Sequence, residues 1–199
     1  MSDRHINLLV ALPAEAKPLI RAFDLQRQQP DGAYPRYLSS HLSLTLTGAG
    51  AEAMRRGVEF LLSQQTATST TWLNVGIAGH GTLPRGTCLL AEKVIDMDSG
   101  RNWALSASTD AVLPKYPLHC VSEAESTYAE NTAYDMESSG FVAGLESAGV
   151  LDRGQILKVV SDNPRQPSTQ INGRMVGDLI QQAIPVLSSL MDRLHSHAE

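Results

Sequence analysis

The chain has 199 residues, of which 42% are hydrophobic and 19% charged, enough for one sizeable hydrophobic core. Its formal net charge of -5 provides no basic stripe to neutralise phosphates, which argues against a nucleic-acid binder. No apolar stretch has the length of a membrane span or the pattern of a signal peptide. Cys88 and Cys120 lack metal-ligand spacing and are too few for a disulfide framework. We expect one cytoplasmic domain over residues 1–199 with reduced thiols.

Strands and helices alternate along the first half of the chain. The apolar run at residues 6–11 predicts a buried strand, and helical spacing follows it, with Pro13 near the helix start where proline is tolerated. Residues 36–50 alternate as a strand, or as a hairpin that ends at Gly48. Residues 51–65 have helical periodicity.

The second half continues this alternation. Buried strands are predicted at 70–79, breaking at the glycines from 76 to 81, and at 86–96 and 154–162. Helices are predicted at 135–149 and from 173 onward, and residues 99–132 are expected to be rich in loops. Uniformly apolar strands that alternate with helices predict an α/β sheet covered on both faces.

Unusual residues follow four of the predicted strands. They are Glu15, the turn Gly48-Ala-Gly50, the glycines from 76 to 81, and Asp162. Ligands of open α/β sheets bind beyond the carboxyl ends of the strands, so this convergence predicts a binding site. His80 lies in the third segment, and we interpret it as a solvated loop histidine.

Glycines at two of these positions have more than one interpretation. "GAGAEA", from Gly48, fits a relaxed dinucleotide fingerprint, but the acid expected about twenty residues later is absent, and a tight turn that packs a helix on the sheet explains it at least as well. "NVGIAGHG" lacks the lysine of a phosphate-binding loop. Its glycines would let a ligand approach the backbone closely, or would form a simple turn.

The acidic candidates are ambiguous on local sequence. Asp162 ends a strand in a Ser-Asp-Asn-Pro turn, where it could cap a turn or form a partly desolvated carboxyl able to hold or give a proton. Glu15 could be an ordinary first-turn helix glutamate. Asp135 and Glu137 in "YDMESSGF" could reflect the preference of helix N-termini for acids, or could grip hydroxyl groups.

Five motifs in order resemble the purine nucleoside phosphorylase and methylthioadenosine/S-adenosylhomocysteine nucleosidase superfamily. They are "LLVALPAEAKPLI", "TLTGAGAEAM", "TWLNVGIAGHGTLPRGTCLLAEKVID", "YDMESSGF" and "LKVVSDNP". "NVGIAG" and "EAKPLI" look most like the futalosine hydrolase and hopanoid-associated branches. The resemblance implies a three-layer αβα phosphorylase/hydrolase-like fold with a central mixed sheet, a small-molecule nucleoside substrate and a homo-oligomer. No motif implies a metal or an organic cofactor.

The resemblance also implies roles for individual residues. Glu137 would bind the ribose hydroxyls and Met136 would pack on the sugar face, while Asp135 matches a less constant acid and would be structural. Asp162 would give a hydrogen bond or proton to N7 of the leaving purine, and Glu15 would orient or deprotonate the attacking water. The substrate would also be lined by Gly50, Gly76, Ile77, Ala78, Gly79 and Ser161.

The nucleophile decides between two enzyme hypotheses. Phosphorylases of the superfamily commonly hold phosphate with an arginine and a serine, where this chain has Asn74 and Ile77, which favours water. Arg55, Arg56 and Arg85 lie nearby in sequence and could still hold phosphate. An N-ribosyl hydrolase leads, and a phosphate-dependent phosphorylase or a non-catalytic nucleoside-binding module is the alternative.

The chain is shorter than typical members of this superfamily, and the shortfall falls between Asp98 and Thr132. In the superfamily this region supplies an aromatic residue that sandwiches the purine. Tyr128 or Trp103 is the candidate to replace it, so the identity of the base is not predicted.

Overall fold

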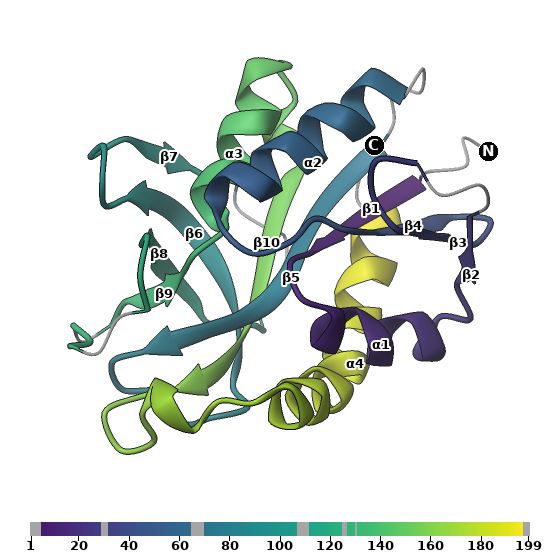
Figure 1. Ribbon diagram of the computed structural model, residues 1–199. Helices are drawn as coiled ribbons and strands as arrows, with labels where there is room; N and C mark the ends of the chain where they lie inside the picture. The colour runs from purple at the N-terminus through teal and green to yellow at the C-terminus, as the bar shows by residue number, and fades with distance from the viewer. Residues whose placement is uncertain are drawn as a thin grey trace.

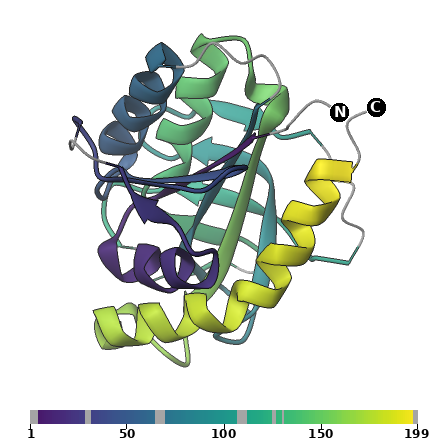
Figure 2. The same ribbon diagram turned by 90° about the vertical axis from the view of Figure 1, so that its right-hand side faces the viewer.

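A mixed sheet, with ten strands among the residues that the structure describes, runs through the centre of the molecule and has helices on both faces (Figures 1 and 2). The computed structural model describes residues 5–28, 32–64, 70–106, 112–124, 127–129 and 131–196. This architecture confirms the predicted three-layer fold with a central mixed sheet. No helix in these ranges is long and apolar enough to cross a membrane.

The first half of the chain builds the parallel part of the sheet. β1 (His5–Val10) pairs in parallel with both β4 (Leu42–Leu46) and β5 (Thr70–His80). β3 (Arg36–Leu38) pairs antiparallel with β4, so the hairpin interpretation is confirmed, and the short β2 (Gln26–Arg27) pairs with β3 at the sheet edge.

The other part of the sheet closes on itself. β10 (Gly154–Asp162) pairs with β5 and with β6 (Cys88–Asp96), and β6 pairs with β8 (Lys115–Cys120). β9 (Ala133–Asp135) then joins β8 back to β5. The strands β5, β10, β6, β8 and β9 are therefore paired in a closed circle, and this closure brings the ends of several strands close together.

Two hydrophobic cores lie on opposite faces of the sheet. α1 (Pro13–Ala22) and α4 (Gly173–Ser196) contribute Leu19 and Leu179 to one core. α2 (Ala51–Gln64) and α3 (Ser138–Ser147) contribute Met54 and Phe141 to the other. The four helices agree with the predicted periodicity, although α3 begins at residue 138 rather than 135. Asp135 instead ends β9.

The predicted break of the third strand at its glycines is wrong. β5 continues to His80, because β10 pairs with it through residue 79 and β9 pairs with its last two residues. His80 is accordingly a buried strand residue, not a solvated loop histidine, and its Nδ1 accepts the N–H groups of Thr82 and Leu83.

The segment from 99 to 132 holds more regular structure than predicted. β7 (Asn102–Ala104) pairs antiparallel with β6, and β8 pairs parallel with it. Residues 107–111, 125, 126 and 130 lie outside the described residues. Two short helical turns, η1 (Leu151–Arg153) and η2 (Ser168–Gln170), flank β10. Cys88 and Cys120 are free thiols.

Candidate active site

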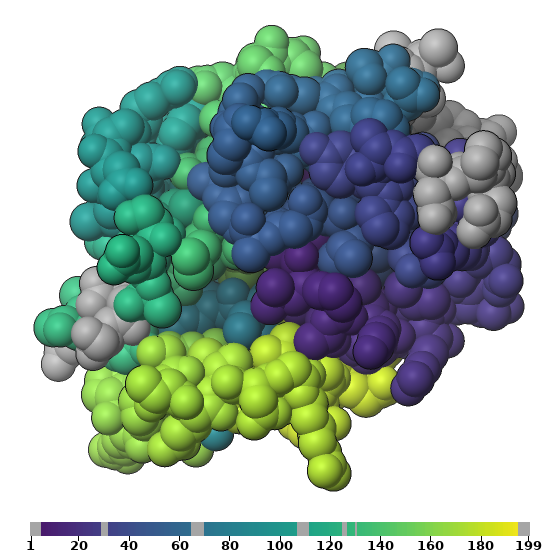
Figure 3. All heavy atoms as spheres, in the orientation of Figure 1, coloured from purple at the N-terminus to yellow at the C-terminus, as the bar shows by residue number. Residues whose placement is uncertain are grey.

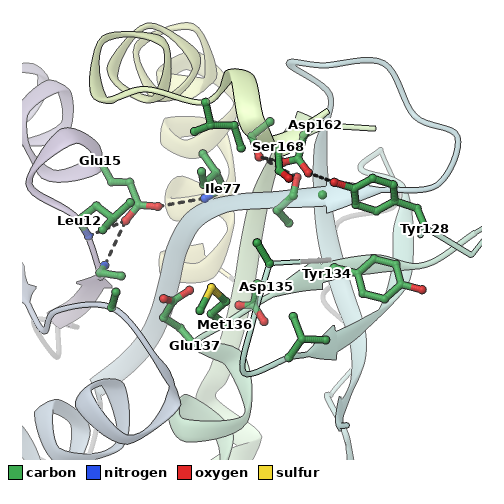
Figure 4. Close-up of a pocket in the computed structure, with 18 residues that line it drawn as sticks. Leu12, Glu15, Ile77, Tyr128, Tyr134, Asp135, Met136, Glu137, Asp162 and Ser168 are labelled. Carbon is green, nitrogen blue, oxygen red and sulfur yellow. Dashed lines mark hydrogen bonds between the residues drawn. The ribbon is translucent and has the colours of Figure 1, made fainter. Parts of the chain in front are cut away.

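A cavity of about 240 Å³ opens where the carboxyl ends of β1, β5, β9 and β10 meet. Figure 3 shows the hollow between the first helix, the segment that precedes α3 and the segment around η2. Figure 4 shows its side chains converging from these elements. Eight residues predicted from sequence line it: Glu15, Ile77, Ala78, Gly79, Met136, Glu137, Ser161 and Asp162.

Glu15 is fixed at one end of the cavity by the main chain. Its Oε2 accepts the N–H groups of Ala11 (3.1 Å) and Leu12 (2.9 Å), and its Oε1 accepts that of Ile77 (3.1 Å). As the third residue of α1 it bonds the backbone that precedes the helix, so the first-turn role and the place in the cavity coexist. Its side chain is held in one orientation.

Burial makes Glu15 a proton acceptor for neutral pH. The residue is 3% exposed, and this burial raises the pKa of its carboxyl to about 7. The positive charge of Lys158 and the bonds from Leu12 and Ile77 work against this rise, while the negative charge of Glu137 adds to it. A carboxyl that titrates near pH 7 is suited to general base catalysis.

Lys158 is the cationic partner that the sequence analysis missed. Its Nζ lies 2.8 Å from Oδ2 of Asp135, and both side chains are 1% exposed. Burial alone would lower the pKa of Lys158, but the charges of Asp135, Glu137 and Glu15 outweigh it and raise that pKa. A single lysine inside the apolar run "ILKVV" was the available signal.

Asp135 connects this lysine to the start of α3. Its carboxylate accepts the backbone N–H of Ser138 (3.1 Å) and the Ser138 hydroxyl (2.6 Å). The aspartate therefore binds the first residue of α3 and pairs with the charge of Lys158. These contacts support the structural role expected for it.

Glu137 is held from the opposite side of the cavity by the glycine turn. Its Oε1 accepts the N–H of Gly50 at 2.9 Å, a contact across 87 residues of sequence. Gly48 and Gly50 have φ values of +91° and +93°, conformations that favour glycine, so "GAG" is a tight turn that delivers this N–H. Burial raises the pKa of Glu137, opposed by Lys158 and reinforced by Asp135.

Asp162 lies at the far end of the cavity and is 5% exposed. Its Oδ1 accepts the hydroxyl of Ser161, and its Oδ2 accepts the hydroxyl of Tyr128. The neighbouring Asn163 makes the turn, because its Oδ1 accepts the N–H groups of Arg165 and Gln166 at 3.0 Å each. The turn role is thus filled by Asn163, and the Asp162 carboxylate faces the cavity.

Two glycines of β5 make room for these acids. A Cβ atom on Gly76 would lie 2.8 Å from Oε1 of Glu15 and 3.3 Å from Nζ of Lys158. A Cβ atom on Gly79 would lie 2.8 Å from Oδ2 of Asp162. Neither Gly76 nor Gly50 lines the cavity. Gly76 leaves space for the side chains of Glu15 and Lys158, and Gly50 donates its N–H to Glu137.

The three arginines considered for phosphate binding do not line the cavity. Arg55 and Arg56 form ion pairs along α2, and Nε of Arg85 donates to the carbonyl of Ser161 at 2.7 Å. Asn74 donates to the carbonyl of Leu9 at 3.1 Å. Among the described residues that line the cavity, none is an arginine.

The structure places one of the two candidate aromatic residues at the cavity and the other away from it. Tyr128 lines the cavity. Trp103 is buried in β7, where its Nε1 donates to Oε2 of Glu146 at 2.9 Å, so Trp103 is not at the site. Within the described ranges, no group of three or more His, Cys, Asp or Glu side chains is arranged to hold a metal ion.

Several solved nucleosidases share this fold. The apo 5'-methylthioadenosine nucleosidase of Arabidopsis thaliana has a TM-score of 0.83 at 14% identity, with 98% of this chain and 97% of that chain covered. The futalosine hydrolase of Helicobacter pylori strain 26695 has a TM-score of 0.77 at 14% identity, with 95% and 97% covered. The S-adenosylhomocysteine nucleosidase of Streptococcus pyogenes, in complex with 5-methylthiotubericidin, has a TM-score of 0.79 at 14% identity, with 98% of each covered.

The fold implied by the five motifs is therefore confirmed. No protein-family model matches the chain, and no curated protein matches its sequence.

Proposed function

We propose that this protein is an N-ribosyl hydrolase that cleaves the N-glycosidic bond of a purine nucleoside or a 5'-modified nucleoside. The observation that carries the proposal is Glu15, a buried carboxyl with a pKa of about 7 that shares one cavity with Glu137 and Asp162. The structural neighbours named above are nucleosidases, which supports an enzyme that hydrolyses N-ribosyl bonds.

Asp162 acts on the base. Breaking the glycosidic bond leaves electrons on the base and an oxocarbenium-like sugar. A hydrogen bond or proton from Asp162 to N7 of the purine makes the base a better leaving group, which is general acid catalysis worth roughly 10²–10⁴-fold. Tyr128 offers an aromatic face beside this position.

Glu137 and Met136 hold the sugar between the two ends. A carboxylate can accept hydrogen bonds from two vicinal hydroxyls, and the bond from Gly50 leaves lone pairs on both oxygens of Glu137 for them. The Met136 side chain lines the same wall and offers an apolar surface to the sugar ring (Figure 4). The positive charge of Lys158 reduces the repulsion between the buried carboxylates of Glu15 and Glu137.

Water is the nucleophile in this proposal. The ionised Glu15 carboxylate takes a proton from a water molecule as it attacks the anomeric carbon, and backbone bonds hold the acceptor in place. A phosphate ion at the same place would face the negative charges of Glu15 and Glu137. The cavity has no arginine among its described residues to offset that repulsion.

The assay that tests this function follows release of free base from a panel of nucleosides, in buffer with and without phosphate. The panel contains methylthioadenosine, S-adenosylhomocysteine and futalosine, after which the structurally similar enzymes are named, together with adenosine and inosine. Base release without phosphate is the expected result. Release that requires phosphate would identify a phosphorylase, and tight binding of intact nucleoside without release would identify a binding module.

Oligomeric state belongs to the same proposal. We propose a homo-oligomer, and sedimentation of the purified protein with and without nucleoside measures it. A monomer that turns over substrate would contradict the proposed homo-oligomer but not the proposed hydrolase activity.

A further inference from the structure

The hydroxyl of Tyr128 already occupies the carboxylate that the leaving base needs. It donates a hydrogen bond to Oδ2 of Asp162, and both side chains line the cavity. Figure 4 shows the tyrosine ring reaching toward the aspartate from the wall opposite Glu15. The base and the tyrosine would therefore both form a hydrogen bond with the carboxyl group of Asp162.

The two oxygens of Asp162 have different surroundings. Oδ1 accepts the hydroxyl of Ser161, a residue that is 1% exposed and whose Oγ also lies 3.2 Å from the carbonyl of Ala78 within the sheet. Oδ2 is held by Tyr128, which comes from a segment outside the sheet. A base in the cavity consequently meets Oδ2.

The ring of Tyr128 is positioned independently of its hydroxyl. A Cβ atom on Gly79 would lie 2.6 Å from Cε1 of the ring. Any side chain at this position of β5 would therefore collide with the Tyr128 ring, and glycine lets the ring pack against the strand. Tyr134 packs edge-on against the same ring, with centroids 5.8 Å apart, and its hydroxyl accepts the N–H of Ala129 at 3.1 Å. Removal of the Tyr128 hydroxyl alone should leave the cavity wall unchanged.

We propose that the Tyr128 hydroxyl competes with the leaving base for Asp162, so that binding exchanges a tyrosine–aspartate hydrogen bond for a base–aspartate hydrogen bond. The inference rests on the proposed function, because it takes the base to bind at Asp162. Breaking the Tyr128–Asp162 hydrogen bond offsets part of the free energy gained when the base bonds to Asp162, so it lowers the affinity for the base. Tyr128 thereby acts as a specificity determinant, since only a base with a hydrogen-bonding atom at this position replaces the bond it breaks.

The decisive variant is Tyr128→Phe, which keeps the ring and removes the competitor. We expect calorimetry with free adenine and free hypoxanthine to give dissociation constants about tenfold lower than for the wild type for the base that the enzyme releases. KM for the corresponding nucleoside should fall with them, and kcat should not rise. The matched control is Tyr116→Phe, a tyrosine on β8 that packs against His80 outside the cavity lining, and it should leave the dissociation constant unchanged.

A second pair of variants assigns the effect to Asp162. In an Asp162→Asn background, adding Tyr128→Phe should change base affinity less than it does in the wild type, because the competition for a carboxylate is gone. Equal changes in both backgrounds would overturn the inference. Unchanged or weaker base binding by Tyr128→Phe would also overturn it, and would make Tyr128 a positioning residue for Asp162.

Failure of this inference is distinguishable from failure of the proposed function. A wild type that releases base, paired with a Tyr128→Phe variant that gains no affinity, removes the competition and leaves the hydrolase. A wild type that neither releases nor binds a base removes both.

Discussion

At one end of the cavity the Glu15 carboxylate accepts three backbone N–H groups, whereas at the other end the Asp162 carboxylate accepts two side-chain hydroxyls. Backbone amides of a strand and a helix start cannot turn away, but hydroxyl groups can rotate and exchange partners. The Glu15 end also contains the buried Lys158. The difference indicates that the Glu15 end of the cavity is rigid and electrostatically tuned, while the Asp162 end is adaptable.

The largest expected effect comes from Asp162. Asp162→Asn keeps the shape and removes the acid, so turnover should fall by about 10²–10⁴-fold in the base-release assay. Circular dichroism and thermal unfolding should remain close to the wild type. Near-normal turnover by a folded variant would remove Asp162 from the mechanism and end the functional contrast between the two ends.

Lys158 tests the electrostatics of the rigid end. Lys158→Met leaves Asp135 buried without its counter-charge, which should cost about 3–5 kcal/mol of the free energy of unfolding, measured with urea. The double variant with Asp135→Asn should recover part of that loss, and Lys17→Met on the exposed face of α1 is the control. If Lys158→Met costs no more than the control, the ion pair is not what holds this end together.

Glu15 predicts a pH dependence of both stability and rate. Its pKa rises from an ordinary 4.5 to about 7 on folding, so between these values the unfolded chain ionises while the folded protein stays protonated. This group's contribution to stability is therefore present below pH 4.5 and is lost as the pH rises through about 7. Glu15→Gln should gain about 3 kcal/mol relative to the wild type between pH 4 and pH 8, as measured by urea unfolding at both values.

The same carboxyl governs the rate in the opposite sense. The base must be ionised, so wild-type kcat/KM should increase with pH up to about 7 and then level off. Glu15→Gln should lose most activity and, in what remains, this limb of the profile. Parallel stability curves for the two proteins, or an unchanged limb, would contradict the assignment of that pKa to Glu15.

Glu137 should give the smallest and most selective effect. Glu137→Gln weakens the acceptor for the ribose hydroxyls, so kcat/KM should fall about tenfold on ribosides and less on matched 2'-deoxyribosides. The ratio of the two losses is the measurement, because a general disturbance of the wall would affect both equally. Equal losses would separate Glu137 from the sugar and assign it to the rigid electrostatic end alone.

The sequence by itself determined the order and type of the long elements. Apolar runs and helical spacing record burial that is local to each segment, so β1, α1, α2, β10 and α4 were predictable. It also put Asp162 at the end of a strand and Glu15 just beyond one, where α/β sheets bind ligands. The resemblance of its motifs to the nucleosidase superfamily added the roles that we propose for them.

Tertiary structure decided how those residues meet. The bonds that shape the site join residues far apart in sequence: 62 positions separate Glu15 from Ile77, 87 separate Gly50 from Glu137, and 34 separate Tyr128 from Asp162. Local periodicity carries no information about such pairs, because they depend on strand register and on the closure of β9 onto β5. For the same reason the glycines of β5 were mistaken for a strand end, and Lys158 could be recognised as a partner only when the fold placed three carboxyl groups around it.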